Sequence, residues 1–574
     1  MKTNLLSSLT KVFPDGFNGE NLSYATLLQN EPFSFQIAFK SENINGDIEP
    51  FYVKVESDLD LDLISQYKVG YVPVTRADFQ NSDEYFERKT AGLYPDMLLE
   101  RKTNQEVKEV VNNVFSYQRF MEQDEENLLC SVENCYQSLW FTINENKQNI
   151  KHGNYFVKIL FFSSKNNECI ATEKIDLKII NASLPKQTLY YTNWFHCDCL
   201  ADTYGVEIFS KKFFEIMRSF ILEAAKTGMN MILLPAFTPA LDTPVGKSRK
   251  TAQLVLVTKE NGEYKFDFSL MKKYVELCRE CGIENFEHSH FFTQWGAKHA
   301  PIVMASENGE YKRIFGWETD SKSEEYSLFL KSYLKQLKVF LKEMNLEKNI
   351  LFHISDEPDD NNISYYENAQ KQIGEELKDY MCGDALSSFK YYEKGHVKKP
   401  IVIVNSKDIN KFVENCDDYW VYYTGAQLTD GGSNRVIPTT SARNRVLGVQ
   451  MYVGGAKGFL HWGYNYYYDF LSHGLFNPCV NPCGYNQLAG TSFVVYPDTK
   501  GKAIPSLRMK IFYEGINDYT ALQKLESLIG RTATLEFIKE TLGEVTYNFC
   551  PANSQLFDFR QKINEKIEFF CKSS

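Results

Sequence analysis

Two adjacent carboxylates at the end of an apolar run are the side chains of this sequence best placed to do chemistry. The run reads Asn-Ile-Leu-Phe-His-Ile-Ser-Asp-Glu-Pro and places Asp356 and Glu357 directly before Pro358. Side chains alternate along a strand, but the break at the proline releases the last residues from strict alternation, so both acids can reach one cleft. Two carboxylates in one cleft indicate glycoside hydrolysis. The structural alternative is that the strand simply ends here and that Asp359 or Asp360 caps the next helix. This alternative does not explain the pair Asp356 and Glu357.

Aromatic rings, amides and imidazoles gather at the ends of three other predicted strands. Pyranose faces are apolar while their hydroxyls need directed hydrogen bonds, so this mixture suits a sugar. The candidates for sugar binding are His290, Gln294, Trp295, Tyr422, Tyr423, His461 and Trp462. For any one of them a packed core residue is the alternative. Their convergence from three strand ends favours binding.

The histidines and cysteines do not predict a metal. His288, His290 and His353 have no carboxylate or fourth ligand at a recognisable spacing, which favours histidines that pack or hydrogen-bond. The 13 cysteines are odd in number and scattered, which is typical of reduced thiols and not of a disulfide framework. We therefore expect neither a metal nor another cofactor.

The elements that must position these groups lie after residue 186, where strand-like and helical runs alternate. This alternation predicts a parallel sheet built from βα units. The eight candidate strands are Leu189–His196, Met229–Leu234, Ile283–Phe291, Ile350–Glu357, Cys382–Leu386, Ile401–Asn405, Tyr419–Thr424 and Gly458–Trp462. Eight strands predict a (β/α)8 TIM-like barrel, in which the active site lies at the C-terminal strand ends. Asp356 and Glu357 then occupy that place on the fourth strand.

Residues 1–185 show strand patterns that predict an antiparallel β-sandwich, while residues 78–126 are polar and irregular and predict long loops. The expected fold class is thus α/β plus all-β. It divides the chain into a sandwich domain, residues 1–185, and a catalytic barrel with a helical C-terminal extension, residues 186–574. Oligomeric state is left open.

Composition narrows the class of ligand. The chain has 574 residues, of which 43% are hydrophobic and 14% aromatic. Its net charge of -11 argues against general nucleic-acid binding and favours an uncharged or weakly charged ligand. No run approaches the roughly 18 apolar residues of a membrane span. The N-terminus has no apolar stretch of signal-peptide length, so we expect a cytoplasmic protein.

Four segments together resemble glycoside hydrolase family 123. They are the His-Ile-Ser-Asp-Glu-Pro run, Ser289–Ala297 (Ser-His-Phe-Phe-Thr-Gln-Trp-Gly-Ala), Gly458–Gly463 (Gly-Phe-Leu-His-Trp-Gly) and Arg508–Tyr519. The resemblance implies a β-N-acetylgalactosaminidase that is retaining and substrate-assisted: the 2-acetamido oxygen of the substrate attacks the anomeric carbon and forms an oxazoline. It also implies terminal β-linked GalNAc glycans as substrate, with a glycolipid, glycoprotein or free oligosaccharide as the source.

Adjacent acids agree with such a mechanism. A two-carboxylate retaining enzyme places its acids about 5 Å apart on opposite sides of the anomeric carbon, which neighbouring residues do less easily. We expect Glu357 to be the general acid and then base, and Asp356 to orient the acetamido N–H. Tyr422 or Tyr423 would donate to the acetamido carbonyl, Trp462 would floor the ring, and the remaining candidates would bind hydroxyls.

Two other classes stay open. A two-carboxylate β-glycosidase acting on a sugar without an acetamido group needs a second acid from another strand end, for which Glu287 and Asp430 are candidates. A non-catalytic carbohydrate-binding barrel would keep the aromatic side chains and use the acids only to bind hydroxyls. The intact Asp356–Glu357 pair argues against that binding module.

Overall fold

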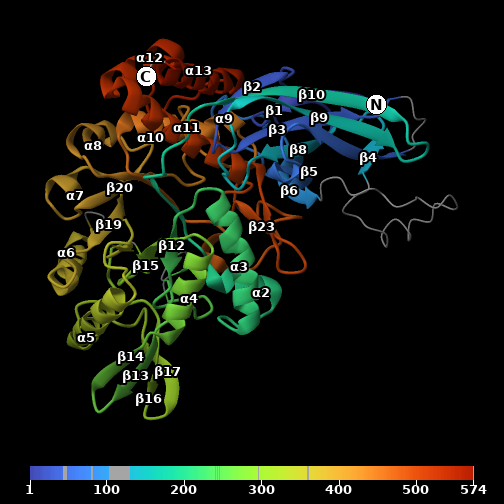
Figure 1. The fold of residues 1–574 in the computed structure, drawn as a ribbon. Coiled ribbons are helices and arrows are strands. Elements are labelled where there is room, and N and C mark those ends of the chain that lie inside the picture. The colour runs from blue at the N-terminus through green and yellow to red at the C-terminus, as the bar shows by residue number, and fades with distance from the viewer. Residues whose placement is uncertain are drawn as a thin grey trace.

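The computed structural model describes the chain except residues 43–47, 79–81, 102–128, 240, 242, 245, 295, 358–360, 486 and 573–574. The described chain forms an N-terminal β-rich region, a closed barrel of eight parallel strands with helices outside, and a C-terminal group of helices (Figure 1). The boundary at residue 185 stays a prediction.

The N-terminal region consists of two five-stranded sheets. The first has the order β1 (Lys2–Ser7), β3 (Phe33–Lys40), β8 (Gln137–Ile143), β5 (Ile64–Val74) and β6 (Gly92–Arg101). The second has the order β2 (Tyr24–Leu28), β10 (Cys169–Ile180), β9 (Gly153–Ser163), β4 (Ile48–Ser57) and β7 (Leu129–Val132). The sheets share an apolar core, in which the ring of Phe39 lies 5.1 Å from that of Phe51 and 6.3 Å from that of Phe161.

The predicted antiparallel sandwich is wrong in two places. β2 pairs in parallel with β10, with Tyr24 opposite Asp176, so the second sheet is mixed. β6 lies inside the segment predicted as loop, where Pro95 obscures the strand pattern. It is an edge strand, and the register shifts at Gly70/Tyr71, opposite this proline; edges and bulges are where a strand tolerates proline. The rest of that predicted loop, from residue 102, lies outside the described residues.

The barrel closes because its last strand pairs with its first. Its strands are β11 (Tyr190–Asn193), β12 (Met231–Leu234), β15 (Asn285–His288), β18 (Ile350–Phe352), β19 (Met381–Leu386), β20 (Lys399–Ile403), β21 (Trp420–Tyr422) and β22 (Gly458–His461). Each overlaps one of the eight predicted segments. Alternation divides the side chains: Met231 and Leu233 belong to the interior cluster, whereas Ile232 and Leu234 pack against the outer helices.

The predicted (β/α)8 TIM-like barrel is nevertheless wrong, because strands and helices do not alternate in single units. Two helices, α2 (Cys197–Tyr204) and α3 (Lys211–Lys226), connect β11 to β12. The connections that contain α4 (Ser269–Glu280) and α5 (Glu324–Glu343) also contain strands of a separate sheet. These extra strands are β13 (Leu256–Glu260), β14 (Glu263–Asp267), β16 (Val303–Glu307) and β17 (Glu310–Phe315), at the bottom of Figure 1.

The sequence carried a signal for this extra sheet. Asn261-Gly262 and Asn308-Gly309 each join two of its strands, and all four residues have positive φ, between 52° and 86°. An Asn-Gly pair with positive φ at both residues is the preferred two-residue hairpin turn. The remaining barrel connections carry α6 (Ile363–Ile373), α7 (Lys390–Glu393), α8 (Ile409–Asn415), α9 (Ser441–Arg445) and α10 (Leu447–Gly454).

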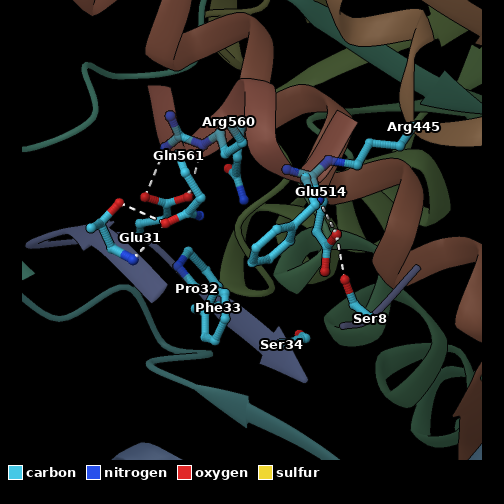
Figure 2. Close-up of a pocket in the computed structure, with 12 residues that line it drawn as sticks. Ser8, Glu31, Pro32, Phe33, Ser34, Arg445, Glu514, Arg560 and Gln561 are labelled. Carbon is cyan, nitrogen blue, oxygen red and sulfur yellow. Dashed lines mark hydrogen bonds and ion pairs between the residues drawn. The ribbon is translucent and has the colours of Figure 1, made fainter. Parts of the chain in front are cut away.

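The C-terminal part ties the barrel to the N-terminal sheets. It contains β23 (Val495–Pro497), β24 (Ala503–Pro505), α11 (Leu507–Ile529), α12 (Arg531–Leu542) and α13 (Asn553–Lys572), so the predicted helical extension also includes a strand pair. α13 lies along β2, where Asn564 donates to the Thr26 carbonyl at 2.9 Å. Figure 2 shows the buried contact beside it, in which Arg560 of α13 pairs with Glu31 at 2.7 Å.

Among the described residues, no helix is both long and apolar enough to span a bilayer. All 13 cysteines are described, and each is a free thiol. Cys278 lies on the buried face of α4 and packs there as an apolar group in the core.

Candidate active site

The acid pair follows β18 but is not part of it. The strand ends at Phe352, four residues before Asp356, and the segment between is fixed by the loop after β15: the Phe292 N–H donates to the Ile354 carbonyl at 3.1 Å, and the Ser355 hydroxyl donates to the Thr293 carbonyl at 2.9 Å. Glu357 has φ +46°, a left-handed conformation that is uncommon for glutamate. This backbone turn releases the pair from strand alternation, a role that was predicted for the break at Pro358.

Tyr422, the last residue of β21, points into the barrel and meets this pair. Its hydroxyl donates to Glu357 Oε1 at 2.5 Å. The ring packs in the interior cluster beside Trp194 and Leu460. Burial and the Glu357 charge raise the pKa of the Tyr422 hydroxyl well above its ordinary value, so this group stays a proton donor. The structure thus brings together two predicted site residues, Glu357 from the segment after β18 and Tyr422 from β21.

The acids act on each other. Burial, and then the neighbouring Glu357 charge, raise the pKa of Asp356 to about 8, although the nearby His353 works in the opposite direction. Asp356 therefore holds its proton to higher pH than an ordinary aspartate does.

Tyr423 and His461 lie away from this site. Because side chains alternate, Tyr423 belongs to the outer layer, where its ring lies 5.0 Å from Phe459 and 5.5 Å from His461. His461 is buried there, and its Nδ1 accepts the Gly463 N–H at 3.0 Å. The structure therefore chooses Tyr422 over Tyr423 for the interior and gives His461 no place among the groups that face it.

Trp462 is half-buried against the interior cluster. Its carbonyl accepts a hydrogen bond from His196 Nε2 at 2.8 Å, while His196 Nδ1 accepts one from Arg249 at 3.0 Å. Arg249 is itself held by two 2.6 Å bonds to Asp198. Burial, followed by the Arg249 charge, lowers the pKa of His196 to about 3, so the ring is neutral and donates through Nε2. This chain of contacts fixes the backbone that presents the Trp462 ring.

Beneath the acid pair lies a buried group centred on His353. Its Nε2 is 2.9 Å from Glu287 Oε2, and its Nδ1 is 3.7 Å from Asp384 Oδ1. Glu287 also accepts from Trp194 Nε1 at 3.0 Å and from the Thr192 hydroxyl. Burial would lower the pKa of His353, but Asp384 and Glu287 outweigh it and raise the pKa to about 10. We conclude that His353 carries a positive charge.

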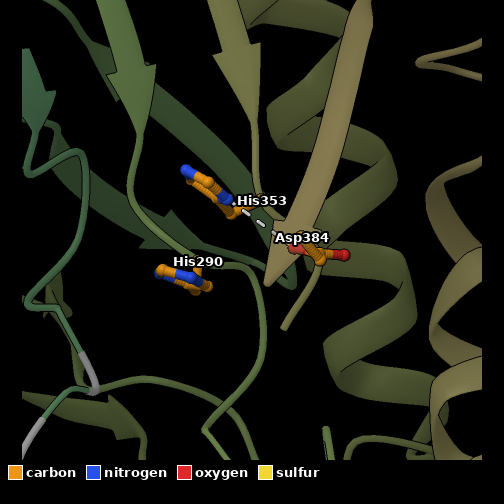
Figure 3. A group of neighbouring side chains, drawn as sticks. All are labelled: His290, His353 and Asp384. Atoms are coloured by element: carbon orange, nitrogen blue, oxygen red, sulfur yellow. Dashed lines mark ion pairs between the residues drawn. The ribbon is translucent and has the colours of Figure 1, made fainter. Parts of the chain in front are cut away.

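His290 stacks on His353 with centroids 4.6 Å apart and planes 18° apart, and Figure 3 shows both rings beside Asp384. Ligand atoms of these three residues lie within 4.8 Å of one another. Imidazole lone pairs lie in the ring plane, so two stacked rings do not converge on one ion, and a protonated His353 has no lone pair to offer. The group fits a hydrogen-bonded charge cluster better than a metal site.

The other named residues are placed as follows. Gln294 is buried in the loop after β15, and Trp295 lies outside the described residues, as do Asp359 and Asp360. Asp430, a candidate second acid, is exposed in a turn with φ +56°. Sequence reasoning missed Asp384 and the His196–Arg249 contact. The available signal for Asp384 was a charged residue inside the otherwise uncharged strand β19.

Comparison with protein families identifies the chain. The family model described as the catalytic domain of glycoside hydrolase 123 matches residues 194–525, more than half of the sequence. The chain belongs to glycoside hydrolase family 123. The matched catalytic region of this family 123 glycoside hydrolase thus begins directly after β11 and includes the other barrel strands, β12 to β22, and most of α11. Its substrate is a carbohydrate. No curated protein sequence matches it.

One solved structure supports the fold of this family 123 enzyme. A family 123 glycoside hydrolase from Clostridium perfringens, described for glycolipid glycan hydrolysis, is similar with a TM-score of 0.71 and 14% identity, covering 99% of this chain and 97% of that chain. At this identity the likeness shows the fold alone. A Ruminococcus gnavus β-glucuronidase (TM-score 0.31, 7% identity, 90% and 97% covered) and EndoBT-3987 from Bacteroides thetaiotamicron (0.23, 9%, 84% and 96%) are too dissimilar to support an argument.

Proposed function

We propose that this family 123 glycoside hydrolase is a retaining, exo-acting β-N-acetylgalactosaminidase that releases terminal β-linked GalNAc by substrate-assisted catalysis. The observation that carries the proposal is the single acid pair, Asp356 and Glu357, with Tyr422 bonded to Glu357. Both acids come from one short segment, so they approach a sugar from the same side. A nucleophile supplied by the substrate fits this arrangement better than a protein carboxylate on the opposite face.

Each group has a role in this mechanism. Glu357 protonates the leaving oxygen as the 2-acetamido oxygen attacks the anomeric carbon, and afterwards takes a proton from the water that opens the oxazoline. Asp356 accepts the acetamido N–H and stabilises the positive charge that develops on this group. The Tyr422 hydroxyl, which donates to Glu357 in the free enzyme, donates to the acetamido carbonyl in the complex. The partly exposed ring of Trp462 floors the sugar.

The two-carboxylate alternative lacks a suitable second acid at the candidate positions. Glu287 is fully buried and holds three partners, Thr192, Trp194 and His353. A carboxylate bound in this way cannot reach an anomeric carbon without breaking its hydrogen bonds. Asp430 is exposed in a turn outside the barrel strands.

The GalNAc preference and the source of the glycan rest on likeness. The family 123 resemblance favours GalNAc, and the structurally similar Clostridium perfringens enzyme is described for glycolipid glycan hydrolysis. We therefore propose glycans with terminal β-GalNAc, glycolipid-derived ones included, as substrates.

Matched aryl glycosides test the proposal. Wild type, Glu357→Gln and Asp356→Asn are assayed on aryl β-GalNAc, β-GlcNAc and β-galactoside, with a GalNAc-thiazoline as an oxazoline mimic. We expect turnover of the GalNAc substrate alone, inhibition by the thiazoline, and a loss of at least about 100-fold in both variants. Equal turnover of the galactoside, or activity that does not depend on Asp356, would refute the mechanism; a preference for GlcNAc would refute only the substrate.

A further inference from the structure

The charge cluster beneath the acid pair has no part in the mechanism above, yet it is built from three strands side by side. His353 follows β18, and its two carboxylate partners come from β15 and β19, the strands on either side of β18. The side chains of His353, Glu287 and Asp384 are 2%, 0% and 1% exposed. Burying three ionisable groups is costly, so their arrangement calls for a function.

The cluster is connected to the acid pair through the backbone. Asp384 Oδ1 accepts the Ile354 N–H at 2.9 Å, and its Oδ2 accepts the Tyr366 hydroxyl at 2.5 Å. Ile354 directly follows His353 and lies two residues before Asp356. The imidazole ring and the acid pair therefore belong to one fixed segment, and the distance between their charges is set by the fold.

The groups that face His353 on each side are accounted for. Glu287 lies on the β15 side and Asp384 on the β19 side, while the neutral His290 covers one ring face and Trp194 approaches from β11 at 6.2 Å between ring centroids. Burial keeps His290 neutral, because it lowers the pKa of that ring well below its ordinary value. The charges that act on Asp356 are those of Glu357, His353 and Asp384, and that of His353 outweighs that of Asp384.

We propose that His353, clamped between Glu287 and Asp384, is a positioning residue whose fixed positive charge favours the ionised form of Asp356 against burial and the neighbouring Glu357 charge. This inference rests on the roles proposed for the two acids. The proposed roles need an ionised Asp356 as the acetamide partner and a protonated Glu357 as the donor to the leaving group. Two adjacent carboxyl groups do not by themselves decide which of them keeps the proton. A buried cation in the same segment as Asp356 shifts this choice toward an ionised Asp356.

The pH profile of kcat/KM separates this role from a merely structural one. His353→Gln removes the cation and keeps a side chain that can donate to Glu287. Without the cation, the Asp356–Glu357 pair gives up each of its two protons less readily. Both limbs of the bell-shaped profile should therefore move to higher pH, by about one unit. Because that variant leaves Glu287 and Asp384 without their cation, the double variant Glu287→Gln/His353→Gln is measured as well; it replaces the ion pair by two amides and should show the same shift.

A matched control is His288→Gln. His288 is also a buried histidine, but its Nε2 is bonded to the Tyr333 hydroxyl at 2.8 Å on the outer side of the barrel. Burial lowers the pKa of the His288 ring to about 3, so this ring is neutral. We expect His288→Gln to change the height of the profile at most, not the position of its limbs. A readout independent of activity is the ¹⁵N spectrum of histidine-labelled wild type, in which the resonances lost in His353→Gln should show an imidazolium at pH 7.

The outcomes are distinct. A shifted profile in both His353 variants together with an imidazolium signal supports the inference. If the limbs of the pH profile do not move and only its maximum falls, or if His353 is neutral at pH 7, the inference is wrong. The proposed function still stands in that case, provided that Asp356→Asn and Glu357→Gln abolish turnover. Full activity of Asp356→Asn would instead overturn the proposed function, and the inference with it.

Discussion

The Tyr422 hydroxyl donates to Glu357 Oε1 at 2.5 Å, although 65 residues separate the two in the chain. The contact joins the end of β21 to the segment after β18, across the interior of the barrel. A neutral donor at this position stabilises the ionised form of the acid that must later take up a proton. The relationship therefore links the geometry of the site to the pH at which it works.

Replacing this donor should weaken catalysis. Tyr422→Phe is expected to lower kcat/KM by about 10- to 100-fold, since a hydrogen bond to a charged group is worth about 1.5–3 kcal/mol. The alkaline limb of the pH profile should move up, because a carboxylate that loses a donor holds its proton more tightly. Tyr423→Phe is the control: its hydroxyl is buried in the outer layer and has no hydrogen-bond partner among the described residues, so activity should be retained. Equal losses in the two variants would contradict the placement.

Asp356→Asn should stabilise the folded chain at alkaline pH. Burial and the Glu357 charge raise the pKa of Asp356 from 3.8 to about 8. Between these values the folded chain holds a proton that the unfolded chain releases, so wild type loses stability as pH rises from about 4 to about 8. The variant escapes this loss and should exceed wild type by on the order of 2 kcal/mol at pH 8, with no difference near pH 4.

Urea unfolding of wild type and Asp356→Asn at pH 4, 6 and 8 checks this expectation. Asp430→Asn, at an exposed turn, serves as the control and should differ from wild type by a small and constant amount. A stability difference for Asp356→Asn that does not grow with pH would count against the raised pKa.

The buried ion network between the barrel and the C-terminal helices should be essential for stability. Arg445 of α9 bonds Asp518 of α11 at 2.7 and 2.8 Å and Glu514 at 2.8 Å, beside the contact shown in Figure 2. Arg445→Met removes the bond to Glu514 and both bonds to Asp518, whose remaining ion pair is with Arg560 at 3.4 Å, so a loss of about 3 kcal/mol in the free energy of unfolding is expected. Arg218→Met, which removes an exposed pair with Glu280, should cost at most about 1 kcal/mol. Similar losses in both would show that the network is not needed.

A change in the substrate tests the nucleophile directly. Fluorine atoms on the N-acetyl group withdraw electron density from the amide oxygen, which is the attacking atom in the proposed mechanism. The N-trifluoroacetyl analogue of the aryl β-GalNAc substrate should therefore react at least about 100-fold more slowly, equivalent to about 3 kcal/mol in the barrier. The comparison is made on kcat, with KM measured separately. Equal rates would point to a protein nucleophile.

The sequence by itself determined the acid pair and the approximate positions of all eight barrel strands. Both are local properties: an apolar run, a pair of carboxylates and a proline are adjacent in the chain, and a buried strand is read from its own residues. The family resemblance rested on the same short segments, and the family assignment is confirmed. The turns Asn261-Gly262 and Asn308-Gly309 are an equally local signal. They predict hairpins that a regular (β/α)8 barrel does not contain, and leaving them out is one reason why that prediction is wrong.

Only the tertiary structure decided which groups surround the acids. Tyr422 and Tyr423 are neighbours with the same chemistry, and the alternation in β21 sends one to the interior and the other to the outer layer. Likewise, nothing in the chain near His353 predicts Glu287 and Asp384 as its partners, because these residues meet only when β15, β18 and β19 lie side by side. The protonation of the site depends on distances between charges, and these distances exist only in the folded chain.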